Sequence, residues 1–391
     1  MWRFARRWLS TSSIPKNTET EQILSGSLGQ DYAKAIEFVK ESNFTQAEEK
    51  FRSTLESLSN QGMFGQPVYN FILQRIALIL RAQKKQNECE KTLEEIVMNY
   101  KAKEKEYSHQ LGTACENLLK QYLQSNIDKA LRFGQYILRE DNWKIFHRHT
   151  QKDLKFLIGT AFLLKDDCHI EAKAQFYECL NMNPGANTCF VLHNLAIAQW
   201  WHATKYQENE IGQLHGPQLS EYKKAILEFN EAAPNLQKAI QLFEALPEAY
   251  DPLDKNTVLK NKLSGPSLTA LTEIGLESEL YEPDKILNSL KKLLKFYEDN
   301  DKGNIGKALA IVGMFMCENG ERGQGLSLLR SALESVRGKN DYNEVFVCSA
   351  YGNALGGEKQ AKYSDLASKI IAGLPYWAEK SAYLHVPVWE F

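Results

Sequence analysis

Small residues recur at a fixed spacing along the chain, inside segments whose apolar residues have the periodicity of an amphipathic helix. Ala35 and Ala47 stand 12 residues apart, and Ala77 and Cys89 repeat this step. Each of them is followed, three or four positions later, by a bulky apolar residue on the same helical face. A small side chain allows two helices to approach closely, and the bulky one fills the adjoining layer. The pattern predicts antiparallel pairs of helices joined by short turns.

A later pair of segments shows this pattern most fully. Gly159 and Phe162 mark its first helix, Ala172 and Phe176 mark its second, and Pro184 ends it. Other pairs follow the same rule with substitutions or interruptions: Leu118–Ile137 with Ala130 in the tight position, a unit from Leu192 whose second helix is delayed to residues 233–243, and a unit with Gly313 and Gly325.

These units resemble the tetratricopeptide repeat family. The first two lie 42 residues apart, and Asn194-Leu195-Ala196 falls in a later unit, a spacing and a signature similar to the kinesin-light-chain style of repeat. The resemblance covers about two thirds of the chain. It implies an all-α fold, a right-handed superhelical solenoid of stacked helix-turn-helix repeats.

One long insertion interrupts the repeat pattern. The step from Ala196 to Ala233 is 37 residues instead of 12, which indicates about 25 extra residues near 202–228. Residues 210–217 have the glycine and proline content of a loop, and a helix is expected from about Ser220.

Proline and glycine also cluster near residues 246–267, where we expect either a linker or an ordered excursion between two halves of the chain. The last residues are rich in aromatic side chains, which we expect to cover the last helix or to insert into a neighbour. The predicted organisation is a targeting presequence at 1–13, an N-terminal repeat array at 22–246 with its insertion near 202–228, the linker or excursion at 247–267, C-terminal helical repeats at 268–373 and an aromatic tail at 374–391.

The first 13 residues have the pattern of a mitochondrial presequence. Arg3, Arg6 and Arg7 share one face of a helical wheel, the opposite face is apolar, and no acidic residue precedes Glu19. Such a segment is drawn inward by the membrane potential and binds import receptors through its apolar face. The position of Arg7 fits cleavage after Leu9. The alternatives are a helix docked on the body of the protein and a peripheral membrane anchor.

Composition narrows the function classes. A net charge of −2 argues against nucleic-acid binding, which draws on a strongly basic surface. Charged residues at 25% and hydrophobic residues at 43% are typical of a soluble chain, and no stretch approaches the ~18 apolar residues that a membrane span needs. The 7 cysteines are dispersed without a CxxC pair, which argues against a disulfide framework.

Signals of catalysis are weak. Glycine-rich stretches at 320–325 and 352–357 do not follow a strand, so they fit turns and close-packed positions of the repeat better than a phosphate-binding loop. One set of side chains could in principle supply zinc ligands, although core positions are the simpler interpretation: Cys168, His169, Cys179, Cys189 and His193. We therefore predict no enzymatic activity, no cofactor and no metal.

The resemblance implies a partner-binding groove lined by the first helix of each pair. Asn194 occupies the position of the family residue that hydrogen-bonds the backbone of a bound peptide, and two tryptophans follow it. The tryptophans could anchor a partner or could simply cover the insertion after them. The predicted partner-binding residues are His193, Asn194, Trp200, Trp201, Gln74, Arg75 and Arg81.

Together these features favour a non-enzymatic mitochondrial scaffold, in the matrix or at the matrix face of the inner membrane. The chain loosely resembles the mitochondrial tetratricopeptide-repeat proteins that assist assembly of respiratory complex III, which implies respiratory-chain subunits as partners. The alternative is a stoichiometric subunit of a large mitochondrial assembly, such as a respiratory complex or the mitoribosome. Neither interpretation includes a nucleic-acid ligand or a transmembrane span.

Overall fold

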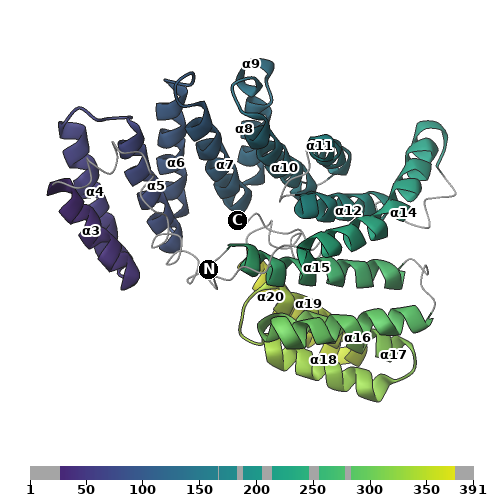
Figure 1. Cartoon of the computed structure of the whole chain (residues 1–391). Helices are drawn as coiled ribbons and strands as arrows, with labels where there is room; N and C mark the ends of the chain where they lie inside the picture. The colour runs from purple at the N-terminus through teal and green to yellow at the C-terminus, as the bar shows by residue number, and fades with distance from the viewer. Residues whose placement is uncertain are drawn as a thin grey trace. The chain divides into compact units, whose positions relative to one another are not determined.

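The computed structural model describes residues 27–165, 167–182, 188–204, 214–245, 255–277 and 283–374. Every regular element in these ranges is a helix, which confirms the predicted all-α fold (Figure 1). The chain divides into two compact units, residues 1–157 and 158–391, and the division falls within helix α10 (Arg148–Leu164). The predicted presequence and the aromatic tail beyond Leu374 lie outside the described residues.

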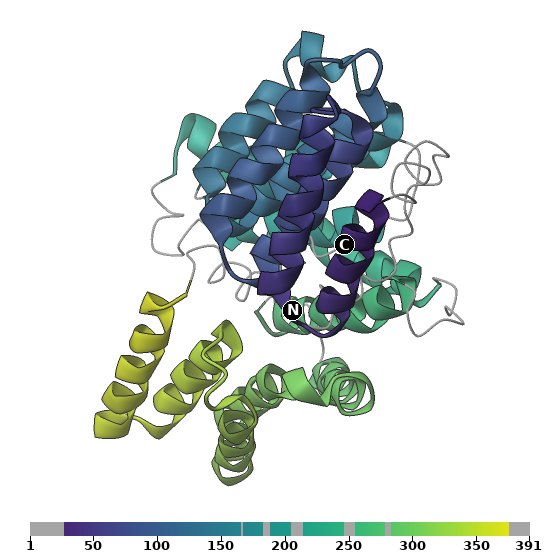
Figure 2. The same cartoon turned by 90° about the vertical axis from the view of Figure 1, so that its left-hand side faces the viewer.

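The first unit is a succession of antiparallel helices, and up to residue 143 each helix packs against the next along the chain. Figures 1 and 2 show these helices side by side in chain order. They are α3 (Ser27–Lys40), α4 (Phe44–Asn60), α5 (Pro67–Ala82), α6 (Gln86–Lys101), α7 (Ser108–Ser125), α8 (Ile127–Ile137), the short α9 (Glu140–Trp143) and the first part of α10.

The second unit continues with the rest of α10 and the helices that follow, again with neighbours in the chain packed together. They are α11 (His169–Asn181), α12 (Thr188–Thr204), α14 (Gly216–Glu244), α15 (Lys255–Glu277), α16 (Pro283–Asn300), the 3-10 helix η1 (Lys302–Asn304), α17 (Ile305–Glu318), α18 (Arg322–Val336), α19 (Tyr342–Leu355) and α20 (Gly357–Ala372).

The step of 12 residues marks the point of closest approach within a helical pair. The thiol of Cys89 donates a hydrogen bond to the carbonyl oxygen of Ala77, 3.3 Å away. A Cβ atom on Gly325 would lie 2.6 Å from the carbonyl oxygen of Gly313, closer than any real Cβ contact. Only a small residue fits at such a crossing, so the predicted spacing is the structural basis of the pair.

Four turns within helical pairs share one backbone geometry. Ser42, Lys84, Asp167 and Gly320 have φ values of 63°, 62°, 56° and 89°, in the left-handed region. Each stands five residues before the small residue of the second helix. At each of three of these turns, the next N–H donates back to a carbonyl in the last turn of the first helix, as at Lys85 to Leu80, 2.9 Å. This is the hydrogen bond of a Schellman motif, which ends the first helix and aims the chain into the second.

Helix α15 differs from the sequence-based expectation. Residues 255–267 belong to this helix, with Pro266 inside it, whereas the sequence predicts a linker or excursion there. Gly265 explains the difference, because a Cβ on it would lie 2.7 Å from the Phe296 ring of α16. The glycine therefore allows two helices to approach closely and does not end one. Residues 247–254 of the predicted linker lie outside the described residues.

The described end of the insertion that follows α12 forms the start of one long helix. Helix α14 begins at Gly216, with Pro217 in its first turn, four residues before the expected start at Ser220. Proline is favourable there because its missing N–H has no partner in a first turn. The single helix packs against both α12 and α15, and residues 205–213 of the insertion lie outside the described residues.

Candidate functional site

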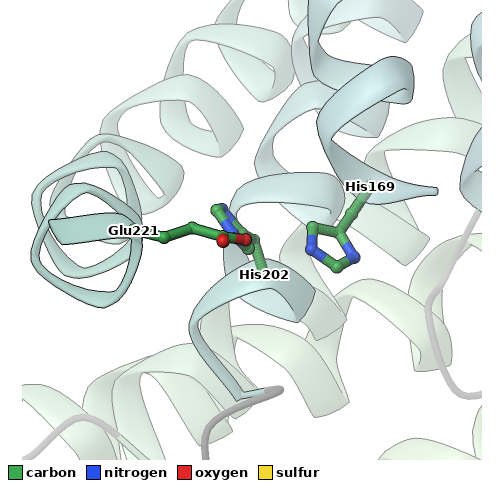
Figure 3. Close-up of side chains that lie close together, drawn as sticks. All are labelled: His169, His202 and Glu221. Carbon is green, nitrogen blue, oxygen red and sulfur yellow. The ribbon is translucent and has the colours of Figure 1, made fainter. Parts of the chain in front are cut away.

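Five charged or polar side chains meet between three helices of the second unit. We call them the α11–α14 cluster: His169 and Lys173, one turn apart at the start of α11, His202 at the end of α12, and Glu221 and Glu228 on α14. Figure 3 shows Glu221 and His169 lying on either side of His202. His169, Lys173 and His202 are 4%, 4% and 1% exposed, whereas the side chain of Glu221 is 38% exposed, so the cluster is open to solvent on the side of Glu221.

His202 occupies the centre of the cluster. Its Nδ1 lies 2.7 Å from the Lys173 Nζ, and its Nε2 lies 3.3 Å from Oε1 of Glu221. Lys173 also forms an ion pair with Glu228, whose Oε2 is 3.7 Å from Nδ1 of His202. The His169 ring lies against the His202 ring, with centroids 4.4 Å apart and planes inclined by 31°.

Burial decides the protonation states in this cluster. Burial lowers the pKa of the His202 imidazole, and the Lys173 ammonium lowers that pKa further. Burial also lowers the pKa of Lys173, while the hydrogen bond to Glu228 acts in the opposite direction. An ammonium group can only donate, so Nδ1 of a neutral His202 accepts from Lys173 and its Nε2–H donates to Glu221.

The same side chains include a set of potential metal ligands. The ligand atoms of His169, His202 and Glu221 lie within 4.8 Å of one another, the one such group of three among the described residues. It shares only His169 with the cysteine and histidine set considered from the sequence. Cys179 and Cys189 of that set are buried residues of the core.

The four predicted partner-binding residues of α12 lie largely inside the second unit. His193, Asn194 and Trp200 are 1%, 0% and 9% exposed, and Trp201 is half-buried. Nδ2 of Asn194 donates to the Thr160 hydroxyl at 3.0 Å, and Nδ1 of His193 lies 2.7 Å from the Ser267 hydroxyl. Helices α14 and α15 both contact α12, the helix that carries these four residues. Their predicted role in binding stays a prediction, with Trp201 the most accessible of the four.

The three predicted residues of α5 lie in the first unit. Arg75 is 2% exposed, with its guanidinium 4.7 Å from the centroid of the Phe71 ring. Nε of Arg81 donates to the side chain of Gln121 at 3.0 Å. Gln74 is half-buried. The two arginines thus make contacts within the unit, and binding by any of the three remains a prediction.

No protein-family model matches the chain, and no curated protein matches it either. Among solved structures, it is similar to a protein described as "Circular tandem repeat protein with novel repeat topology and enhanced subunit contact surfaces". That similarity covers 98% of each chain, with 12% identity and a TM-score of 0.28. A score this low carries no argument about function, so the helical-repeat assignment rests on the helices described above.

The structure also tests the expectation about membranes. Within the described ranges, no helix combines the length and the apolar composition that crossing a bilayer requires.

The sequence contains one overlooked signal for the α11–α14 cluster. His169 stands three residues before Ala172, as Phe44 stands before Ala47. Phe44 is buried, and so is Ile127 at the corresponding position of α8. The same position holds Gln86 in α6 and Arg322 in α18, and both are exposed, so His169 is the buried polar residue at this position. Its partners on α14 could not be found in the same way, because the insertion interrupts the register.

Proposed function

We propose that this chain is a non-enzymatic mitochondrial scaffold that binds protein partners and assists the assembly or stability of an inner-membrane respiratory complex. The observation that carries the proposal is the succession of helical pairs from α3 to α8 and from α17 to α20. Such arrays bury their apolar faces against neighbouring pairs and leave an extended surface for proteins. The arginine-rich start of the chain supports a location in the matrix or at the matrix face of the inner membrane.

The state of the cysteines supports a role without catalysis. Burial raises the pKa of Cys115 to about 12 and the pKa of Cys348 to about 11. Burial also raises the pKa of Cys89. A thiol acts as a nucleophile only as the thiolate, so these three groups are poor candidates for covalent catalysis. They fit the interpretation of cysteine as a small core residue.

A permanent subunit of a large mitochondrial assembly is the second candidate. Its support is the pair Ile226 and Leu227 on α14, which are 37% and 69% exposed although both are large and apolar. These apolar side chains are available for burial against a partner subunit. An assembly factor and a subunit differ in stoichiometry, which can be measured.

The experiment is purification of the full-length tagged chain from mitochondria, followed by quantitative mass spectrometry of what accompanies it. We expect respiratory-chain subunits at levels that rise when assembly is stalled and stay well below one copy per mature complex. A fixed ratio to one complex would favour the permanent subunit. Absence of the chain from mitochondria would overturn both.

Trp201 offers a variant for the same experiment. It is half-buried on α12, so Trp201→Ala should weaken partner recovery while the helical circular dichroism is retained. Met98→Ala removes an exposed apolar side chain of α6 and is the control, for which partner recovery should be unchanged. Full recovery of every partner with a folded Trp201→Ala protein would exclude this side chain from the interface.

A further inference from the structure

Three potential ligands converge in the α11–α14 cluster from three different helices. His169 begins α11, His202 lies in the last turn of α12, and Glu221 lies in the second turn of α14. From this convergence we propose that His169, His202 and Glu221 bind one zinc ion. Two imidazoles and one carboxylate form a common protein ligand set for zinc. The site is independent of the scaffold function proposed above.

The spacing of the donor atoms fits this ion. Ligands of tetrahedral zinc at about 2.0–2.2 Å from the metal lie roughly 3.3–3.5 Å from one another. Nε2 of His202 and Oε1 of Glu221 are already 3.3 Å apart. All three ligand atoms lie within 4.8 Å of one another, so the third ligand has a short distance to move. The side chain of Glu221 is 38% exposed, which leaves a path for the ion and a position for water as fourth ligand.

Burial of the imidazole of His169 costs free energy, and the packing of the repeat does not require a histidine at this position. At the equivalent position of the other second helices, a buried residue is apolar, as Phe44 and Ile127 are at 7% and 6% exposure, and a polar residue is exposed, as Gln86 and Arg322 are. His169 is equally buried, at 4%, so its ring nitrogens are withdrawn from bulk water. Metal coordination would offset this cost, because a neutral imidazole offers its lone pair to the ion.

The charges of the cluster also favour a cation. Glu221 and Glu228 bring two carboxylates to the cluster, and the cations paired with Glu228 are the buried Lys173 and the exposed Lys224. Burial holds the pKa of His202 below its usual range, which favours the neutral imidazole that a metal ion requires. Glu221 would add a negatively charged ligand beside it, and opposite charge favours a bound cation.

Binding requires two local rearrangements. The His169 ring lies against the face of the His202 ring, so it must turn about its side-chain torsions until a nitrogen lone pair points at the ion. Zinc on Nε2 of His202 displaces the hydrogen now donated to Glu221, and that proton leaves for the solvent. Nδ1 then takes a proton from Lys173, which becomes a neutral amine, so that His202 stays a neutral imidazole beside Glu228.

The test is zinc titration of the full-length protein after removal of metal with a chelator. We expect one zinc ion per chain, measured by competition with a chromophoric chelator, and a higher melting temperature with zinc. Cobalt in place of zinc should give the strong visible absorption of a tetrahedral site. No saturable binding to the parent protein would overturn the proposal.

Matched variants separate this site from adventitious surface binding. His169→Phe restores the residue found at the corresponding position of α4, and Glu221→Gln removes the ligand charge from a partly exposed residue. Each should weaken zinc binding by more than roughly tenfold with helical content intact. His149→Gln, at an exposed histidine of α10, should bind as the parent does. Parent-like affinity in both folded variants would show that the cluster is a structural polar network only.

Discussion

The residue at the turn within a helical pair is chosen by backbone geometry, and three of the four described examples are not glycine. Ser42, Lys84 and Asp167 accept a left-handed conformation that costs an ordinary residue about 1–2 kcal/mol, and Gly320 adopts it freely. The cost is tolerated because the small residue five positions later must meet its partner across the pair.

A reciprocal pair of substitutions tests this. Gly320→Ala should lower the free energy of unfolding by about 1 kcal/mol, because φ is 89° and a Cβ there contacts nothing within 4 Å. Lys84→Gly, at a φ of 62°, should be neutral or stabilising by up to about 1 kcal/mol. Urea unfolding of both variants gives the comparison, and a loss of stability in Lys84→Gly would contradict the argument from strain.

Glu116 on α7 makes stability depend on pH. Burial raises its pKa to about 7, although Lys120 acts in the opposite direction. In the unfolded chain the carboxyl ionises near its ordinary pKa of 4.5, so the folded state holds its proton more tightly. The stabilising contribution of the protonated carboxyl is therefore fully present below pH 4.5, and the free energy of unfolding falls as the pH rises towards 7.

Glu116→Gln should remove this dependence. We expect the variant to be more stable than the parent at pH 8 by roughly 1–3 kcal/mol and similar to it at pH 4.5. Melting temperatures measured at both pH values decide the matter. An identical difference at the two values would mean that the carboxyl is ionised in the folded protein throughout.

At the scale of elements, a charged residue follows the small residue of several second helices and pairs with the next helical pair. Glu48 pairs with Lys85 at 3.0 Å, and Glu90 pairs with Lys129 at 2.6 Å. Lys173 stands at the same position in α11, one residue after Ala172, and pairs with Glu228. In this third pair the charges are reversed, because the lysine follows the small residue and the glutamate lies on the next helical pair.

Exchanging one such pair tests its contribution. Glu90→Lys should destabilise the first unit by roughly 1–3 kcal/mol, because it places like charges together with the Glu90 side chain only 5% exposed. Adding Lys129→Glu should restore at least about 1 kcal/mol. The double-mutant cycle is measured by urea unfolding. Additive effects would mean that the two side chains do not interact across the helical pairs.

The elements could be predicted where a small residue at a crossing leaves a trace at fixed spacing. Ala47 and Gly325 do so, and the pairs α3–α4 and α17–α18 follow directly. The first part of helix α15 was not predicted, because Gly265 and Pro266 are compatible both with the end of a helix and with a position inside one. The α11–α14 cluster was not predicted, because tertiary packing places Glu221 beside the two histidines. The insertion separates these residues in the sequence, so no local spacing indicates that they meet.

At the scale of the whole molecule, the proposed location depends on residues 1–13, which lie outside the described part of the chain. Replacing Arg3, Arg6 and Arg7 with glutamate should abolish import into isolated mitochondria without changing the melting temperature, because the repeats begin later. The measurement is protease protection of radiolabelled chain. Import and processing of this variant at the parent rate would refute the presequence.

The charges are reversed between the ion pairs Glu48–Lys85 and Lys173–Glu228, so the sign of the charge differs from one helical pair to another. If the pair ending in α11 stacked ahead of α5 and α6, Lys173 would meet Lys85, and two ammonium groups would be forced together. Like charges at such a half-buried contact disfavour the wrong neighbour, as opposite charges favour the right one. We therefore expect the alternation of sign to act against stacking of these helical pairs out of sequence.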